Sequence, residues 1–138
     1  MSVTFHLRCA GVLLIALGLA HGAFGQRLNW RTDLQKLSVV NRQIFLVHCF
    51  YIALLLILLG SLSLFLTPYL RQPNPLARAI LAASTLLWAV RLYIQWFVFE
   101  RSLWRDDRFN RRVHYLLTGF WIYFTAVNGF ALYCNRYT

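Results

Sequence analysis

Acidic side chains are the scarcest feature of this chain. Its 138 residues include four Asp and Glu against 14 Lys and Arg, and charged residues make up only 13% of the total. A soluble domain carries roughly twice that share, about 25%. Since a water-facing surface needs more charge than this chain has, lipid must cover much of it. The composition therefore excludes an ordinary soluble domain.

Several motifs that would indicate catalysis are also absent. The sequence has no Gly-rich phosphate loop, no nucleophile elbow and no His-Glu-x-x-His pattern. No two carboxylates fall inside one apolar run, where they would serve as a general acid–base pair. The three cysteines, Cys9, Cys49 and Cys134, show no CxxC spacing, and we expect free thiols, with a Cys9–Cys134 disulfide as the alternative. We therefore predict that the protein is not an enzyme.

What the chain has in quantity is apolar sequence, since 59% of its residues are hydrophobic. Four apolar runs cover about 9–25, 44–70, 79–103 and 113–134. A helix needs roughly 20 such residues to cross a bilayer, and in lipid its backbone groups must be satisfied within the helix. The sequence therefore predicts an all-α polytopic membrane protein, a four-transmembrane-helix bundle that forms a single domain over residues 1–138.

The first of these runs has a second interpretation. Arg8 precedes a short apolar stretch. Ala23 and Gly25, on either side of Phe24, are small residues of the kind that a signal peptidase accepts. Cleavage would, however, export the most basic loops of the chain. We therefore expect the run to remain as a spanning helix.

Basic residues are distributed unevenly between the two sides of the predicted membrane. One side holds four, Arg8, Arg71, Arg78 and Arg136, and the other holds nine, Arg27, Arg31, Lys36, Arg42, Arg101, Arg105, Arg108, Arg111 and Arg112. The positive-inside rule places the nine in the cytoplasm and both termini in the periplasm. Because Lys36 is the only lysine, the arginine-rich composition favours a bacterial inner membrane. The net charge of +10 then indicates contact with anionic lipid headgroups and not with nucleic acid.

The first basic loop contains a weak helical pattern over about residues 30–41. Trp30, Leu34, Leu37 and Asn41 recur at helical spacing, with polar residues between them. This pattern is typical of a short amphipathic helix lying in the membrane interface. A polar linker with incidental leucines is the alternative.

Arg91 is the most informative polar residue, because it lies near the middle of the third run with about twelve residues on either side. A central arginine costs about 2.5–3.5 kcal/mol on translocon scales, so we expect a compensating partner. Gln95, one turn further on, and Asn128 on the fourth run are candidates. Arg91 then either binds an external anion or an acid of a partner subunit, or it holds the bundle together. A proton or ion pathway is a third interpretation.

Histidines form a second pattern. His21, His48 and His114 fall in the cytoplasmic half of their runs, and Glu100 falls in that half of the third run. Helix bundles build haem and metal sites from facing side chains at one level, so a haem b or a metal ion is a possible cofactor, with His48 and His114 as axial ligands. The alternative is a set of hydrogen-bonded interfacial histidines and no cofactor.

Small residues on the first run allow close helix packing. Gly18 and Gly22 form a G-x-x-x-G step, and Gly11 lies seven residues before Gly18. These glycines serve either the packing inside the bundle or a contact with a partner.

Two segments resemble small bacterial four-helix membrane proteins that have no assigned function. They are LWAVRLYIQWFVFER, residues 87–101, and NRQIFLVH, residues 41–48. In that family the pattern is an arginine, a glutamine one turn later and an acid–arginine pair. Here this pattern falls on Arg91, Gln95, Glu100 and Arg101. The resemblance implies the four-helix fold and no particular function.

We expect a small membrane protein that acts by lateral association, as an accessory subunit of a membrane complex or as a homo-oligomer, without chemistry of its own. Its partner would be another membrane subunit or a second copy. One alternative is a haem- or metal-binding electron-transfer protein that uses His48 and His114. A second is a lipid-binding protein or small transporter centred on Arg91.

Overall fold

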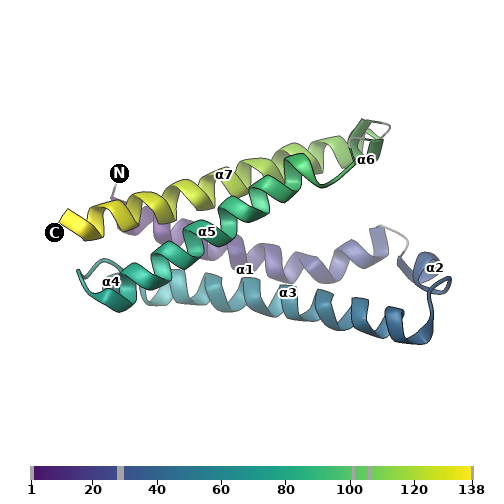
Figure 1. The fold of residues 1–138 in the computed structure, drawn as a ribbon, viewed down its shortest axis with the longest axis horizontal. Coiled ribbons are helices and arrows are strands. Elements are labelled where there is room, and N and C mark those ends of the chain that lie inside the picture. The colour runs from purple at the N-terminus through teal and green to yellow at the C-terminus, as the bar shows by residue number, and fades with distance from the viewer. Residues whose placement is uncertain (1, 28–29, 101, 106, 138) are drawn as a thin grey trace. The chain divides into compact units, whose positions relative to one another are not determined.

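Helices account for every regular element that the computed structural model describes, over residues 2–27, 30–100, 102–105 and 107–137 (Figure 1). In chain order they are α1 (Val3–Arg27), α2 (Trp30–Leu34), α3 (Val39–Phe65), α4 (Thr67–Leu70), α5 (Pro75–Phe97), α6 (Ser102–Arg105) and α7 (Arg108–Tyr137). Of these, α1, α3, α5 and α7 are long and apolar enough to cross a membrane. The all-α class and the four spanning helices are confirmed, and the chain is a multi-pass membrane protein.

Contacts divide the chain, which we predicted as one domain, into two compact units. The first unit is residues 8–67, with most of α1 and all of α2 and α3. The second unit is residues 1–7 together with 68–138 and contains α5, α6 and α7. Arg101 lies outside the described residues, as do the side chains of Arg27, Arg31, Arg105 and Arg136.

In the first unit, α1 packs closely on α3 through glycines. A Cβ atom on Gly11 would lie 2.7 Å from the carbonyl oxygen of Gly60, and one on Gly18 would lie 2.9 Å from that of Ala53. Real Cβ atoms do not approach backbone so closely, so only glycine fits at these positions. The helix runs from Val3 to Arg27, and its part that is apolar enough to span a membrane, Val3–Ala23, begins six residues before the predicted span of about 9–25.

The second predicted span, 44–70, was wrong at both ends. α3 begins at Val39 because Ser38 caps it, with its Oγ accepting a hydrogen bond from Asn41 N at 3.3 Å. It ends at Phe65, and Pro68 lies in the separate short helix α4. A proline ring clashes with the carbonyl four residues before it, which prevents α3 from continuing through Pro68.

The predicted interfacial helix over 30–41 was also too long. Only Trp30–Leu34 forms a helix, and the chain then turns, with Lys36 N donating to Asp33 O at 3.1 Å. Ser38 begins the next helix as its N-cap, so the helical spacing of residues 30–41 does not belong to one element.

In the second unit, α5 lies four to six residues earlier than the predicted span of 79–103. Asn74 caps the helix by accepting from Ala77 N at 2.8 Å, and Pro75 occupies its first turn, where a proline is well tolerated. The helix ends at Phe97, so Glu100 lies in the connector to α6 and not within the spanning helix as predicted.

The last helix, α7, is longer than the predicted span of 113–134. It begins at Arg108 because Asp107 accepts a hydrogen bond from Phe109 N at 2.9 Å, as an N-cap does. It continues to Tyr137 and packs along α5, while the short α6 folds back on α7.

A buried side-chain amide connects the C-terminal part of α7 to the segment that precedes α5. Asn135 on α7 is 2% exposed and donates Nδ2–H to the carbonyl oxygens of Leu70 and Gln72, at 3.0 and 2.7 Å. Arg78 on α5 in turn donates to Oδ1 and to the backbone oxygen of Asn135, each at 3.2 Å. The connector between α4 and α5 is thereby held against α7.

Candidate anion-binding site

A polar seam joins α5 to α7. His114, Trp121, Asn128 and Asn135 follow one another every seven residues on α7, so they share a face of that helix. Trp121 stacks on Trp88 of α5, with ring centroids 5.5 Å apart and planes 6° apart. The two helices therefore meet through aromatic and polar groups. Sequence reasoning missed this seam, although the seven-residue spacing was a readable signal.

Arg91 lies on this seam and finds its partners inside the hairpin. Its Nη1 donates to Oε1 of Gln95 at 3.1 Å, and its Cζ lies 4.9 Å from the ring centroid of Trp121 and 5.6 Å from that of Phe99. A cation over an aromatic face is attracted by about 0.5–2 kcal/mol, more when it is desolvated. The hydrogen bond and the two rings together compensate the cost of burying this charge.

The position of Arg91 also differs from the prediction. Because α5 ends at Phe97, Arg91 lies six residues from the end of its helix and not near its middle. At 1.5 Å per residue this is about 9 Å, a distance that the long side chain shortens by pointing towards the interface.

Gln95 links Arg91 to His114 through two hydrogen bonds. The Gln95 side chain is 2% exposed, and Arg91 can only donate, so the amide oxygen must face the guanidinium. The amide nitrogen then donates to Nδ1 of His114, 2.8 Å away. With Nδ1 as an acceptor, the ring proton of the neutral His114 is on Nε2. The hydrogen-bond chain thus leaves His114 with one N–H donor.

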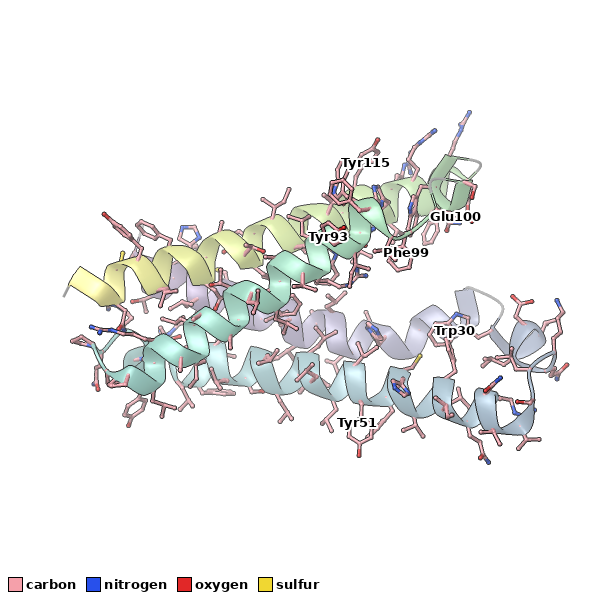
Figure 2. The ribbon with its side chains drawn as sticks, viewed as in Figure 1. Trp30, Tyr51, Tyr93, Phe99, Glu100 and Tyr115 are labelled. Atoms are coloured by element: carbon pink, nitrogen blue, oxygen red, sulfur yellow. The ribbon has the colours of Figure 1, made fainter. Side chains whose placement is uncertain are left out.

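Aromatic side chains surround His114. The Trp104 ring on α6 stacks on it at 4.8 Å and 30°, and the Trp96 ring on α5 lies at 5.8 Å. These groups line an open pocket of about 230 Å³, which we call the aromatic pocket. The described residues that line it are Gln95, Trp96, Phe99, Trp104, Arg111, His114 and Tyr115. Figure 2 labels two of them, Phe99 and Tyr115.

The aromatic pocket is rich in hydrogen-bond donors. Arg111 and His114 both line it, the latter with its proton on Nε2, and the buried indole Nε1 of the lining residue Trp104 has no acceptor among the described residues. None of the described lining residues is acidic. The two carboxylates of the adjoining connector that the structure describes are used locally, since Glu100 accepts from Ser102 Oγ and Asp107 caps α7. The arrangement suits an oxyanion.

The other predicted site residues lie elsewhere. Asn128 donates to Phe124 O of its own helix at 2.8 Å. His48 is exposed on α3 and donates Nδ1–H to Ile44 O at 2.8 Å, while His21 on α1 makes the same kind of bond, at 3.4 Å, to Leu17 O. His48 belongs to the first unit and His114 to the second, and their role as a haem pair stays a prediction. Among the described residues, no three His, Cys, Asp or Glu side chains form a group fit for a metal ion.

Comparison with known proteins identifies no relative, because no family model, curated protein or solved structure matches the chain. The resemblance carried by Arg91, Gln95 and Glu100 therefore stays a prediction.

Proposed function

We propose that this multi-pass membrane protein binds the oxyanion head group of an anionic lipid in the aromatic pocket. The observation that carries the proposal is the excess of donors there. Arg111 and His114 line the pocket and carry N–H groups, the buried indole Nε1 of the lining residue Trp104 has no acceptor among the described residues, and none of the described lining residues is acidic. Buried polar groups are rarely left unpaired in native proteins, so a ligand that brings acceptors would complete the site.

The place of the pocket along the chain favours a lipid as that ligand. The lining residues come from the last turns of α5, the first turns of α7 and the connector between them, where spanning helices reach the headgroup layer. Its aromatic rings are also typical of the membrane interface. With the nine-cation side in the cytoplasm, the pocket would face the inner leaflet of a bacterial inner membrane.

Lateral association with a second subunit or a second copy also stays a prediction, but it has lost two of its arguments. Arg91 is satisfied by Gln95 and Trp121, and it no longer calls for an acid on a partner. Gly11 and Gly18 face α3 in the same unit, so these two glycines serve internal packing. Lipid binding is therefore the better supported of the two.

Two neighbouring arginines allow a sharp test. The full chain would be placed in phosphatidylcholine nanodiscs and titrated with short-chain phosphatidic acid by calorimetry. Arg111 lines the pocket, whereas Arg112, also exposed at the start of α7, does not. A hydrogen bond to a charged group is worth about 1.5–3 kcal/mol, so Arg111→Gln should raise Kd about tenfold or more. Arg112→Gln should leave Kd within about twofold.

Trp104→Phe provides a second variant, because phenylalanine keeps a ring against His114 and loses the N–H. It should weaken binding about two- to tenfold, as the loss of one hydrogen bond does. Equal losses in Arg111→Gln and Arg112→Gln would contradict the proposal, since they would indicate only general attraction of anionic lipid to a basic surface.

A further inference from the structure

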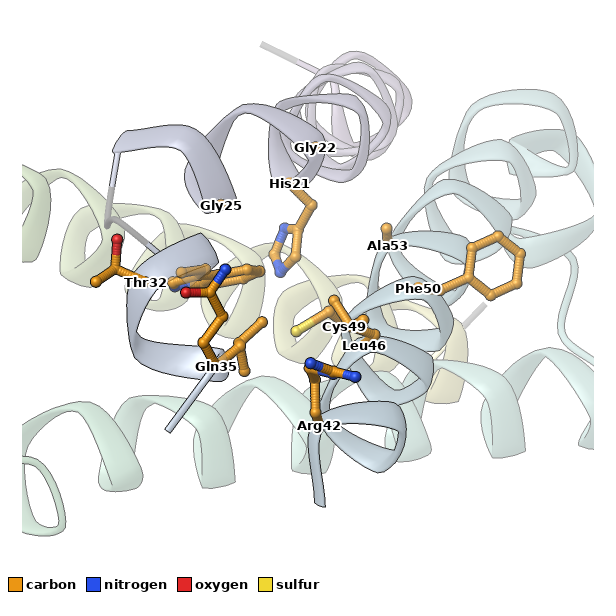
Figure 3. Close-up of a pocket in the computed structure, with 12 residues that line it drawn as sticks. His21, Gly22, Gly25, Thr32, Gln35, Arg42, Leu46, Cys49, Phe50 and Ala53 are labelled. Atoms are coloured by element: carbon orange, nitrogen blue, oxygen red, sulfur yellow. The ribbon is translucent and has the colours of Figure 1, made fainter. Parts of the chain in front are cut away.

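A larger pocket, which we call the α1–α3 pocket, lies in the first unit. It has a volume of about 890 Å³, within the range of small-molecule sites. α1, α2 and α3 all contribute to its lining, and Figure 3 shows His21 on α1 pointing across it towards Cys49 on α3. None of these residues lines the aromatic pocket, so the two pockets are separate features.

Two contacts of Trp30 hold α2 beside this pocket. A Cβ atom on Gly25 would lie 3.0 Å from the Trp30 ring, so the absence of a side chain there seats the indole against α1. The same ring meets Phe45 of α3 edge to face, with centroids 4.9 Å apart. Trp30 and α2 therefore form one wall of the pocket, on the side of the segment that joins α1 to α3.

Space inside the pocket depends on Gly22. No atom of the described residues lies within 4 Å of a Cβ atom placed on this glycine, although it lines the pocket, whereas Gly11 and Gly18 on the same helix face backbone. The second glycine of the G-x-x-x-G step thus leaves room and makes no helix contact.

The lining changes character along α3. Arg42 lies one turn into the helix, and Leu46, Cys49 and Ala53 follow at helical spacing. Eleven residues separate Arg42 from Ala53, about 16 Å at 1.5 Å per residue. The pocket therefore has a cationic end near the membrane surface, and its lining becomes apolar towards the membrane interior.

The charge of Arg42 is not balanced within the described part of the chain. Asp33, the acid nearest to it in sequence, pairs with Lys36 at 3.0 Å, and none of the described lining residues is acidic. Gln35 and Thr32 add polar groups to the same loop. An oxyanion at this end would pair with the guanidinium, since arginine favours carboxylate and phosphate oxygens.

We infer that the α1–α3 pocket binds a single-chain anionic amphiphile, with its oxyanion at Arg42 and its chain along Leu46, Cys49 and Ala53. The head group is a carboxylate, as in a fatty acid, or a phosphate, as in a lysophospholipid. This site is independent of the aromatic pocket, and its binding would make the protein a carrier or sensor of single-chain lipids.

Cys49 gives a local test because it lines the pocket. The full chain carrying Cys9→Ser and Cys134→Ser would be placed in phosphatidylcholine nanodiscs, and the rate of Cys49 alkylation by N-ethylmaleimide measured. Oleate, oleoyl lysophosphatidate and neutral oleyl alcohol would be added in turn. Oleate or the lysophosphatidate should slow alkylation at least fivefold in a saturable way, and oleyl alcohol should not. Protection by oleate alone would identify the carboxylate as the head group, and protection by the lysophosphatidate alone would identify the phosphate.

Arg42→Gln should raise the half-protecting concentration about tenfold, because it removes the charged donor. Arg112→Gln is the control, since it removes one charge from an exposed position outside the pocket, and it should shift that concentration less than twofold. Gly22→Leu should slow alkylation without ligand by filling the space.

Three results would overturn the inference: equal protection by oleyl alcohol, no protection by either anion, or an unreactive Cys49 in the ligand-free protein. Arg111→Gln should leave the protection of Cys49 unchanged, so that failure here and failure of the proposed function are told apart. Circular dichroism and the elution volume of each variant verify that it folds.

Discussion

Arg91 shows how a charged side chain within a spanning helix can be satisfied. Its guanidinium uses Gln95 as an acceptor and the ring faces of Trp121 and Phe99, all within one hairpin. Gln95 in turn donates a hydrogen bond to His114, so the three residues form one hydrogen-bond chain. Replacing Gln95 leaves the buried charge of Arg91 without its hydrogen-bond acceptor. Replacing Arg91 instead removes the charge together with the free-energy cost of burying it.

Gln95→Leu should therefore destabilise the protein more than Arg91→Met does. We expect a loss of about 2–3 kcal/mol for Gln95→Leu, which removes the hydrogen bonds of Gln95 to both Arg91 and His114, and less than about 1 kcal/mol for Arg91→Met. Reversible unfolding in mixed micelles measures both. Gln43→Leu, at an exposed position on α3, is the control and should stay within about 0.5 kcal/mol. A larger loss in Arg91→Met would show that the arginine contributes net stability.

At the scale of elements, backbone contact sets the packing of α1 on α3. Gly11 and Gly60 face one another so closely that a Cβ atom on either would lie 2.7 Å from the carbonyl oxygen of the other. In lipid there is little hydrophobic gain from joining two apolar helices, and close packing of this kind supplies much of the attraction. The α5–α7 pair uses a different device, namely the polar seam from His114 to Asn135.

Gly60→Ala should push α1 and α3 apart and destabilise the protein by about 1–3 kcal/mol, as overpacking does. Gly22→Ala, with open space around its Cβ, should be neutral or slightly stabilising because alanine favours the helix by up to about 1 kcal/mol. The same unfolding assay compares the two variants. If both alanines behave alike, the close contact at Gly60 does not exist in the membrane.

For the whole molecule, the distribution of charge predicts the orientation. Ser102 belongs to the connector on the side with nine cations, and Gln72 belongs to the connector on the side with four. Both residues are exposed. One spanning helix, α5, separates these two connectors, so they lie on opposite faces of the membrane.

Labelling with a membrane-impermeant maleimide would test the orientation. In a cysteine-free background, Gln72→Cys should react in intact bacterial spheroplasts, and Ser102→Cys should react only after the membrane is opened. The reverse pattern would place the nine cations outside and contradict the positive-inside assignment.

The number of spans, and roughly where they lie, could be read from the sequence, because hydropathy is a sum over neighbouring residues. Their ends were misjudged where a local cap decides the boundary, as Ser38 does for α3 and Asn74 for α5. The pairing of Arg91 with Gln95 was also predictable, since residues four apart share a helix face.

Only the tertiary structure decided which residues of different helices meet. Gly11 faces Gly60, Gln95 reaches His114, and Arg42 shares a pocket with His21 because helices rotate and approach until their side chains interlock. That fit depends on the shapes of all the residues involved, whereas periodicity in the sequence shows only which residues share a face of one helix. The sequence therefore determined that this protein crosses the membrane four times, and packing decided where its two pockets lie.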